Sequence, residues 1–259
     1  MIDETHPSDW RQLQSGVCRI FREIGLSAEE AKTLTTARGK VEVDVYAVDT
    51  ASVDQISYVV ECKNWTSRIS QSVVHSFTTV MYETGANIGF IVCKEGLQQG
   101  AEQYLQNTNI RGYTYAEFQQ RYLEVWFERY FGPTLGDAAD DLLRYTEPFN
   151  SYRIKNEFSL EVSILERLET LRTDWSMLAT VIMFLKLKRD LPQAGVDLGC
   201  PAIDDVGRFK DAMEKALPNG YKLGGKTYRE LLGELLKIVR IATEGFNTAF
   251  GRNIFRGES

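Results

Sequence analysis

The sequence predicts an α/β domain with a mixed sheet flanked by helices, followed by an all-helical C-terminal domain. Two observations carry this prediction. Up to about residue 131, apolar residues at helical spacing alternate with short apolar stretches of strand length. After Gly132-Pro133, the apolar residues recur at helical spacing almost throughout. We therefore expect a first domain over residues 1–131 and a helical domain over residues 132–259, for recognition, dimerisation or control.

The elements of the first domain follow from spacing and from turn residues. Ser27-x-x-Glu30 has the form of a capping box and predicts a short helix. The apolar pattern predicts the other elements, with a polar turn between the first two strands: helices over 9–24, 71–83, 97–106 and 116–131, and strands over 41–46, 56–65, 88–93 and 113–115.

Two apolar stripes at helical spacing dominate the second half of the chain. We interpret them as core, with an oligomer interface as the alternative. One stripe comprises Leu165, Leu168, Leu171, Trp175 and Leu178; the other comprises Leu231, Leu232, Leu235, Ile238, Val239, Ala242 and Phe246.

Composition excludes several classes of protein. With 43% hydrophobic and 25% charged residues, the 259-residue chain is too apolar for a disordered protein. Its longest strongly apolar stretch, residues 177–185, is far shorter than the roughly 20 residues that a bilayer span needs. The acidic, polar first ten residues are unlike a signal or transit peptide. We expect a cytoplasmic protein with no membrane contact.

The spacing of the cysteines, the number of histidines and the net charge exclude several kinds of functional site. Cys18, Cys62, Cys93 and Cys200 stand alone at wide spacings, which argues against a disulfide framework and a zinc ribbon. Two histidines in the whole chain exclude most histidine-based metal sites. The net charge is −6, whereas a protein that holds nucleic acid by charge alone should be basic. Any nucleic-acid role must therefore rest on a local site or a partner.

Two predicted strands of the first domain carry charged residues. The first strand carries Asp44, and the second ends in Glu61-Cys62-Lys63. Because residues two apart share a strand face, Glu61 and Lys63 point the same way. If the strands pair as a hairpin, one carboxylate from each could converge with Lys63 at the strand ends.

Two carboxylates and a lysine make a workable phosphodiesterase site. Carboxylates bind Mg²⁺, which polarises a phosphate and lowers the pKa of an attacking water. Lys63 can orient that water or stabilise the transition state, and the backbone carbonyl of Cys62 is a further candidate ligand. The spacing alone is weak, because Glu30-Ala-Lys32 repeats it. That second copy falls in a predicted helix, where residues two apart do not face each other.

With these motifs, the sequence resembles the Mrr-like branch of the PD-(D/E)xK, or restriction-endonuclease-like, nucleases. The resemblance implies that fold for the first domain, Asp44 and Glu61 as metal ligands, Lys63 as catalytic lysine, and DNA cleavage in prokaryotic defence. It runs from about residue 10 to residue 118 and rests on the helix before Gly25, Val43-Asp44-Val45, the strand Val59-Val-Glu-Cys-Lys-Asn-Trp65, Gly85-Ala-x-x-Gly89-Phe-Ile-Val and the stretch 95–102.

The sequence departs from the family pattern at two positions. Val43 stands where the family's name-giving proline precedes the aspartate, which is common in the superfamily. Counting back from Gly25, Gln14 stands where the first helix often carries a metal-site glutamate. Glutamine can position a water but is a poor Mg²⁺ ligand, so one ion instead of two, or reduced activity, is expected.

Other polar and aromatic residues are candidates for contact with DNA. Gln71 and His75 share a helix face, and Gln71-x-x-x-His75 loosely resembles the Gln-x-x-x-Tyr motif of RecB-like nucleases. A solvated polar face is the plainer interpretation of that helix. Trp65 and Arg68 follow the charged strand and could meet a nucleotide strand, although aromatic packing explains Trp65 equally well.

We therefore expect a DNA endonuclease that uses Mg²⁺, with Mn²⁺ as a substitute. Cutting both strands of a duplex usually needs two active sites, which makes a homodimer plausible. Two alternatives stay open. One is a nuclease effector held off until a ligand or a regulatory protein partner engages the helical half. The other is a decayed nuclease fold that serves as a DNA- or protein-binding module.

Overall fold

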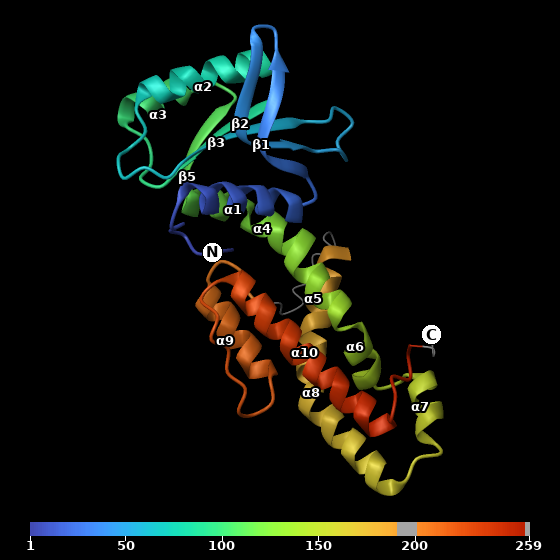
Figure 1. The fold of residues 1–259 in the computed structure, drawn as a ribbon. Helices are drawn as coiled ribbons and strands as arrows, with labels where there is room; N and C mark the ends of the chain where they lie inside the picture. The colour runs from blue at the N-terminus through green and yellow to red at the C-terminus, as the bar shows by residue number, and fades with distance from the viewer. Residues whose placement is uncertain (191–200, 257–259) are drawn as a thin grey trace. The chain divides into compact units, whose positions relative to one another are not determined.

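The computed structural model describes residues 1–190 and 201–256, which leaves Cys200 outside the described residues. Contacts divide the chain into two compact units, residues 1–126 and 127–259. The division falls after Trp126, a little before the boundary expected after residue 131. Figure 1 shows the elements of both units.

The first unit is built on one five-stranded mixed sheet in the order β1-β2-β3-β4-β5. The antiparallel strands β1, β2 and β3 are followed by β4 and β5, which pair in parallel. Helices α2 and α3 cover one face, and α1 and α4 cover the other (Figure 1). The elements are α1 (Trp10–Glu23), β1 (Ser27–Thr36), β2 (Gly39–Val48), β3 (Ser57–Lys63), α2 (Gln71–Thr84), β4 (Ile88–Cys93), α3 (Gln99–Leu105), β5 (Ile110–Thr114) and α4 (Tyr115–Trp126). The predicted α/β class is confirmed.

The short helix predicted from Ser27-x-x-Glu30 is wrong, because these residues begin strand β1. The strand pairs with β2 from Ser27 opposite Val48 to Thr36 opposite Gly39, with a gap at Ala31. This ladder satisfies the backbone groups that the predicted cap would have served. The helical argument against Glu30-x-Lys32 is therefore also wrong. Lys32 instead pairs with Glu29 at 2.7 Å on the outermost strand.

The predicted helix over 116–131 is divided. Helix α4 ends at Trp126, and a π-helical turn, η1 (Phe127–Phe131), follows it. The last strand begins at Ile110, three residues before the predicted start at Tyr113.

An aromatic cluster fixes α1 and α4 to the sheet. The ring of Phe21 on α1 lies 5.7 Å from Tyr58 of β3 and 6.3 Å from Phe90 of β4, between ring centroids. Phe118 of α4 lies 5.5 Å from Phe21 and 5.8 Å from Phe90. Tyr58 and Phe90 therefore mark the sheet face that looks toward α1 and α4.

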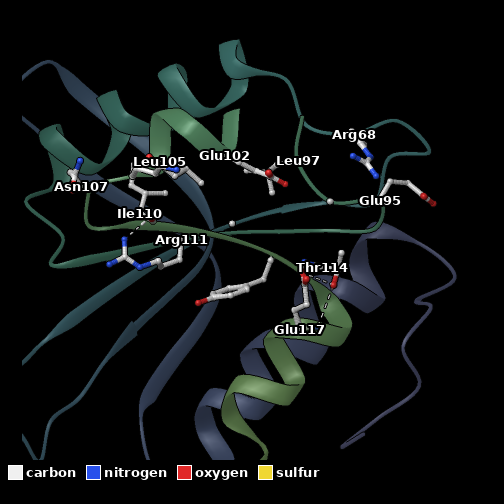
Figure 2. A pocket seen from close by; sticks show the side chains of 14 residues that line it. Arg68, Glu95, Leu97, Glu102, Leu105, Asn107, Ile110, Arg111, Thr114 and Glu117 are labelled. Atoms are coloured by element: carbon white, nitrogen blue, oxygen red, sulfur yellow. Dashed lines mark hydrogen bonds between the residues drawn. The ribbon is translucent and has the colours of Figure 1, made fainter. Parts of the chain in front are cut away.

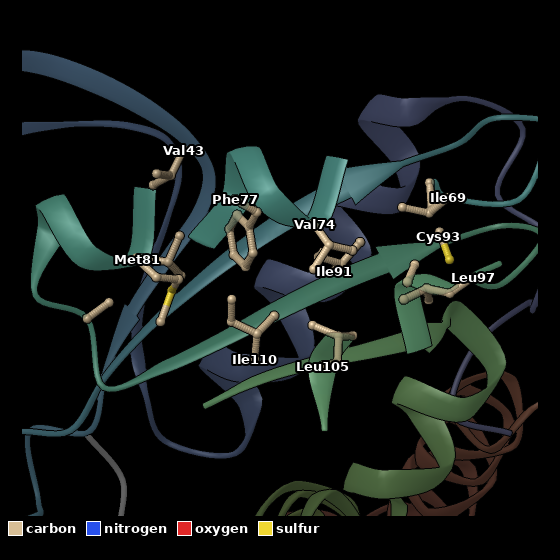
Figure 3. Packing of buried hydrophobic residues seen from close by; sticks show 13 residues of the cluster. Val43, Ile69, Val74, Phe77, Met81, Ile91, Cys93, Leu97, Leu105 and Ile110 are labelled. Carbon is tan, nitrogen blue, oxygen red and sulfur yellow. The ribbon is translucent and has the colours of Figure 1, made fainter. Parts of the chain in front are cut away.

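The opposite face packs against α2 and α3 through a cluster of aliphatic, Phe and Met side chains (Figure 3). At Gly89 of β4, an added Cβ would lie 2.7 Å from the sulfur of Met81 and 2.8 Å from a ring carbon of Phe77. Helix α2 can therefore approach β4 this closely only because residue 89 has no side chain.

The second unit is helical in all its described elements. Helix α8 contacts α5, α6, α9 and α10. Most residues of the two predicted stripes are buried, including Leu168 and Leu235, which confirms that they form core; Leu165 and Leu171 are partly exposed. The helices are α5 (Gly132–Ala138), α6 (Asp140–Thr146), α7 (Ser151–Glu157), α8 (Val162–Asp190), α9 (Val206–Ala216) and α10 (Tyr228–Phe250). Among the described residues, no helix is both long and apolar enough to cross a bilayer.

Candidate active site

Asp44 and Glu61 lie where β2 and β3 separate. The antiparallel ladder ends at the pair Val45–Val60, and one step further the same register would place Asp44 opposite Glu61. Asp44 instead accepts the backbone N–H of Cys62 through Oδ2, at 2.7 Å. A side-chain oxygen thus replaces a main-chain acceptor where the ladder ends, and it fixes the Asp44 carboxylate against β3.

Glu61 and Lys63 lie on one face of β3, as predicted. Their side chains form an ion pair and are 27% and 22% exposed, so both remain accessible. In the parallel ladder Glu61 is opposite Ile91 and Lys63 is opposite Cys93, on the face that packs against α2 and α3. The structure therefore brings the predicted lysine to one of the two predicted carboxylates.

Cys62 lies between these residues but turns its side chain to the opposite sheet face. The thiol is buried, and burial raises its pKa well above the ordinary value; the Asp44 and Glu61 carboxylates raise it further. Because its pKa is raised, the thiol stays protonated, and a protonated thiol is a poor metal ligand. The main chain is therefore the part of Cys62 that can serve the site.

Gln14 of α1 lies next to Asp44. Its side chain is buried, and Nε2 donates a hydrogen bond to the backbone oxygen of Asp44 at 2.6 Å. The residue that the sequence places at the family's glutamate position therefore positions Asp44 through the main chain. The amide leaves the site with one carboxylate fewer than a glutamate would give.

A cavity of about 400 Å³ opens beside these groups. It is lined by Asp44, Cys62, Lys63, Asn64 and Trp65, and by Asp9 and Trp10 at the start of α1, but not by Glu61. No sequence pattern predicted Trp10 at this cavity; Trp10 directly follows the helix N-cap Asp9. The ring centre of Trp65 lies 5.6 Å from Nζ of Lys63, and contact of Trp65 with DNA stays a prediction.

The other predicted contact residues lie elsewhere. Gln71 and His75 on α2 contact each other, at 3.3 Å between Nε2 atoms, and the His75 ring lies 4.2 Å from the ring of Tyr104 on α3. Neither residue lines the cavity beside Asp44. Arg68 lines a different cavity, of about 780 Å³, along β5 and α3 (Figure 2).

The residues present fit Mg²⁺. Among the described residues no group of three or more His, Cys, Asp or Glu side chains is placed to hold a metal ion, so an ion at this site would depend on the carboxylates of Asp44 and Glu61. Mg²⁺ typically binds one or two carboxylates and completes its shell with waters and substrate phosphate. The buried Oδ1 of Asn64 has no hydrogen-bond partner in the described part of the chain, which leaves an acceptor for such a water.

Comparison with known proteins adds to this geometry. Residues 6–121 match a family model described as a restriction endonuclease, the Mrr catalytic domain. The first unit contains an Mrr-type restriction-endonuclease domain. This match confirms the resemblance found in the sequence, and the matched residues include Gln14, Asp44, Glu61 and Lys63.

Curated proteins and solved structures do not identify a function for the chain. The chain has no significant match among the curated proteins. One solved structure, titled a protein of unknown function, AF1548, aligns with 87% of this chain and 98% of its own, at 12% identity and a TM-score of 0.38. The family match therefore covers residues 6–121, within the first unit.

Proposed function

We propose that the protein is a Mg²⁺-dependent DNA endonuclease that hydrolyses phosphodiester bonds and acts in prokaryotic defence against foreign DNA. One observation carries the chemical part of the proposal. In an Mrr-type domain, Asp44 and Lys63 line one cavity where β2 and β3 separate, and Glu61 forms an ion pair with Lys63. The restriction-endonuclease family supports DNA as the substrate and defence as the setting.

Each residue has a separate role in this proposal. Asp44 and Glu61 would hold Mg²⁺ where β2 and β3 separate. When bound, the metal polarises that phosphate and lowers the pKa of the attacking water. Lys63, paired with Glu61, places a positive charge where negative charge develops in the transition state. Gln14 holds the main chain of Asp44 in position.

Cleavage of supercoiled and linear DNA by the purified full chain tests the proposal. The reactions contain Mg²⁺, Mn²⁺ or EDTA, and the Glu61→Ala variant is assayed beside the parent. We expect cutting with either metal, none with EDTA, and none by the variant. Cutting that persists in EDTA, or in Glu61→Ala, would contradict the assignment of the site.

Substitution of Gln14 distinguishes positioning from metal binding. Gln14→Ala removes the hydrogen bond to Asp44, and a lost hydrogen bond of this kind costs about 1 kcal/mol. We therefore expect activity to fall roughly tenfold or less, and Mg²⁺ dependence to persist. Gln14→Glu should instead change the Mg²⁺ concentration needed for half-maximal rate, because it adds a carboxylate beside Asp44. Titration of the cleavage rate with Mg²⁺ measures both effects.

One observation favours a second candidate, a nuclease effector gated by a ligand or a protein partner. The first unit carries 11 Lys and Arg against 16 Asp and Glu, a net charge of −5. An acidic domain is repelled by the phosphate backbone and is therefore poorly suited to tight, free-standing duplex binding. Folded protein that cuts no DNA under any metal, but cuts once a co-purified partner is added, would favour this candidate.

A further inference from the structure

Two exposed tryptophans line the cavity beside the candidate active site. Trp10 is 51% exposed and Trp65 is 46% exposed, whereas the other two tryptophans, Trp126 and Trp175, are buried. Both exposed rings line the same cavity of about 400 Å³ as Asp44 and Lys63. Large aromatic side chains left in water next to reactive groups indicate a surface that meets a ligand.

The two rings are held in place by their own elements. Trp10 is the first residue of α1, whose N-cap Asp9 accepts the backbone N–H of Gln12 at 2.9 Å. Trp65 follows β3 and lies beside Lys63. Both rings are therefore attached at the ends of regular elements. We expect binding of a ligand to cost little conformational entropy there.

Cations accompany both rings. The guanidinium of Arg11 lies 4.6 Å from the Trp10 ring centre, and the ammonium of Lys63 lies 5.6 Å from the Trp65 ring centre. Stacking rings combined with nearby cations are the usual means of holding single-stranded nucleic acid, since bases stack on the rings and phosphates meet the cations.

The charge of the unit points the same way. Duplex DNA is held chiefly through its phosphates, and a unit with a net charge of −5 is unfavourable for that mode. Base stacking on tryptophan does not depend on net charge, but it needs bases that are out of the duplex stack. From these observations we infer that the substrate of this site is unpaired DNA, single-stranded or locally opened, whose bases flanking the scissile phosphate stack on Trp10 and Trp65. This inference rests on the proposed nuclease function and specifies its substrate.

Binding measured in EDTA tests the inference without cleavage. A fluorescent oligothymidine and a duplex of the same length are titrated with the full chain. We expect the single strand to bind at least about tenfold more tightly, and Trp10→Leu and Trp65→Leu each to lose about tenfold of that affinity. Trp10→Phe and Trp65→Phe should keep most of it, because phenylalanine retains a stacking face. Phe158→Ala, which removes an 85% exposed aromatic ring from the second unit, serves as the control.

The parent chain gives a second readout that needs no variant. Because Trp126 and Trp175 are buried, quenching of intrinsic fluorescence reports on Trp10 and Trp65. We expect quenching by the single strand and little by the duplex. Equal affinity for both nucleic acids, or Leu variants that bind like the parent, would overturn the inference.

These outcomes are separable from those of the cleavage assay. Mg²⁺-dependent cutting with unchanged activity of both Leu variants on single strands would sustain the nuclease and reject the stacking sites. Selective binding without cutting under any metal would sustain the stacking sites and reject the nuclease.

Discussion

Asp44→Asn is expected to abolish cleavage while leaving the fold intact. The asparagine side chain keeps a carbonyl oxygen that can accept the Cys62 N–H, so the end of the β2–β3 ladder is retained. It loses the negative charge that holds Mg²⁺. Metal stabilisation of the transition state is worth several kcal/mol, so we expect the single-turnover rate to fall about a thousandfold or more.

Two further variants separate charge from geometry. Asp44→Ala removes both the charge and the acceptor for the Cys62 N–H, so it should lose activity equally but also lower the thermal midpoint. Glu42→Gln removes an exposed charge two residues away on the same strand and should leave the activity and the thermal midpoint unchanged. Cleavage by Asp44→Asn within threefold of the parent would show that Asp44 is not a metal ligand.

The strand pattern predicted the position of the candidate site residues but not their contacts. Period-two alternation places Glu61 and Lys63 on one face, and the ion pair agrees with it. The alternation does not show where the two strands stop pairing. The ladder ends at Val45–Val60 because Asp44 takes over the Cys62 N–H, and no spacing in the sequence encodes that exchange.

Strand β1 shows why local signals fail. Ser27-x-x-Glu30 matches the pattern that begins many helices. Here, however, pairing with the neighbouring strand β2 makes these residues a strand. The edge of β2 next to Ser27–Thr36 offers backbone partners to every residue of β1 except Ala31, and tertiary pairing overrides a weak local preference. The same limit applies to Trp10, whose place at the cavity depends on how α1 packs against the sheet.

The position and chemistry of Gln14 were predictable from the sequence, but its contact with Asp44 was not. Its position in the first helix follows from counting back from Gly25, and its poor suitability as a ligand follows from its chemistry. Its hydrogen bond to the Asp44 main chain requires the helix to lie across β2, which periodicity cannot show. Long-range contacts of this kind connect residues 30 positions apart in the chain, beyond the reach of any local pattern.

Phe21→Ala is expected to be the most destabilising single change in the first unit. Phe21 is fully buried, and its ring meets Tyr58, Phe90, Phe118 and Tyr122, so it joins α1 to β3, β4 and α4. Truncating a buried phenylalanine to alanine typically costs about 3–5 kcal/mol, and denaturant unfolding of the full chain would measure it. Phe21→Leu should cost less, and Phe149→Ala, at a ring that is 91% exposed, should change stability by no more than about 0.5 kcal/mol.

Activity of the Phe21 variants connects this packing to the site. Helix α1 carries both Gln14, which holds Asp44, and Trp10, which lines the cavity. Loss of the ring that fixes α1 to the sheet should therefore loosen both contacts in molecules that remain folded. We expect Phe21→Leu to lower the cleavage rate by more than Gln14→Ala does, at a temperature where both variants are fully folded. A Phe21→Leu variant that unfolds more easily but cleaves like the parent would show that the site tolerates movement of α1. In that case β2 and β3 alone would position Asp44.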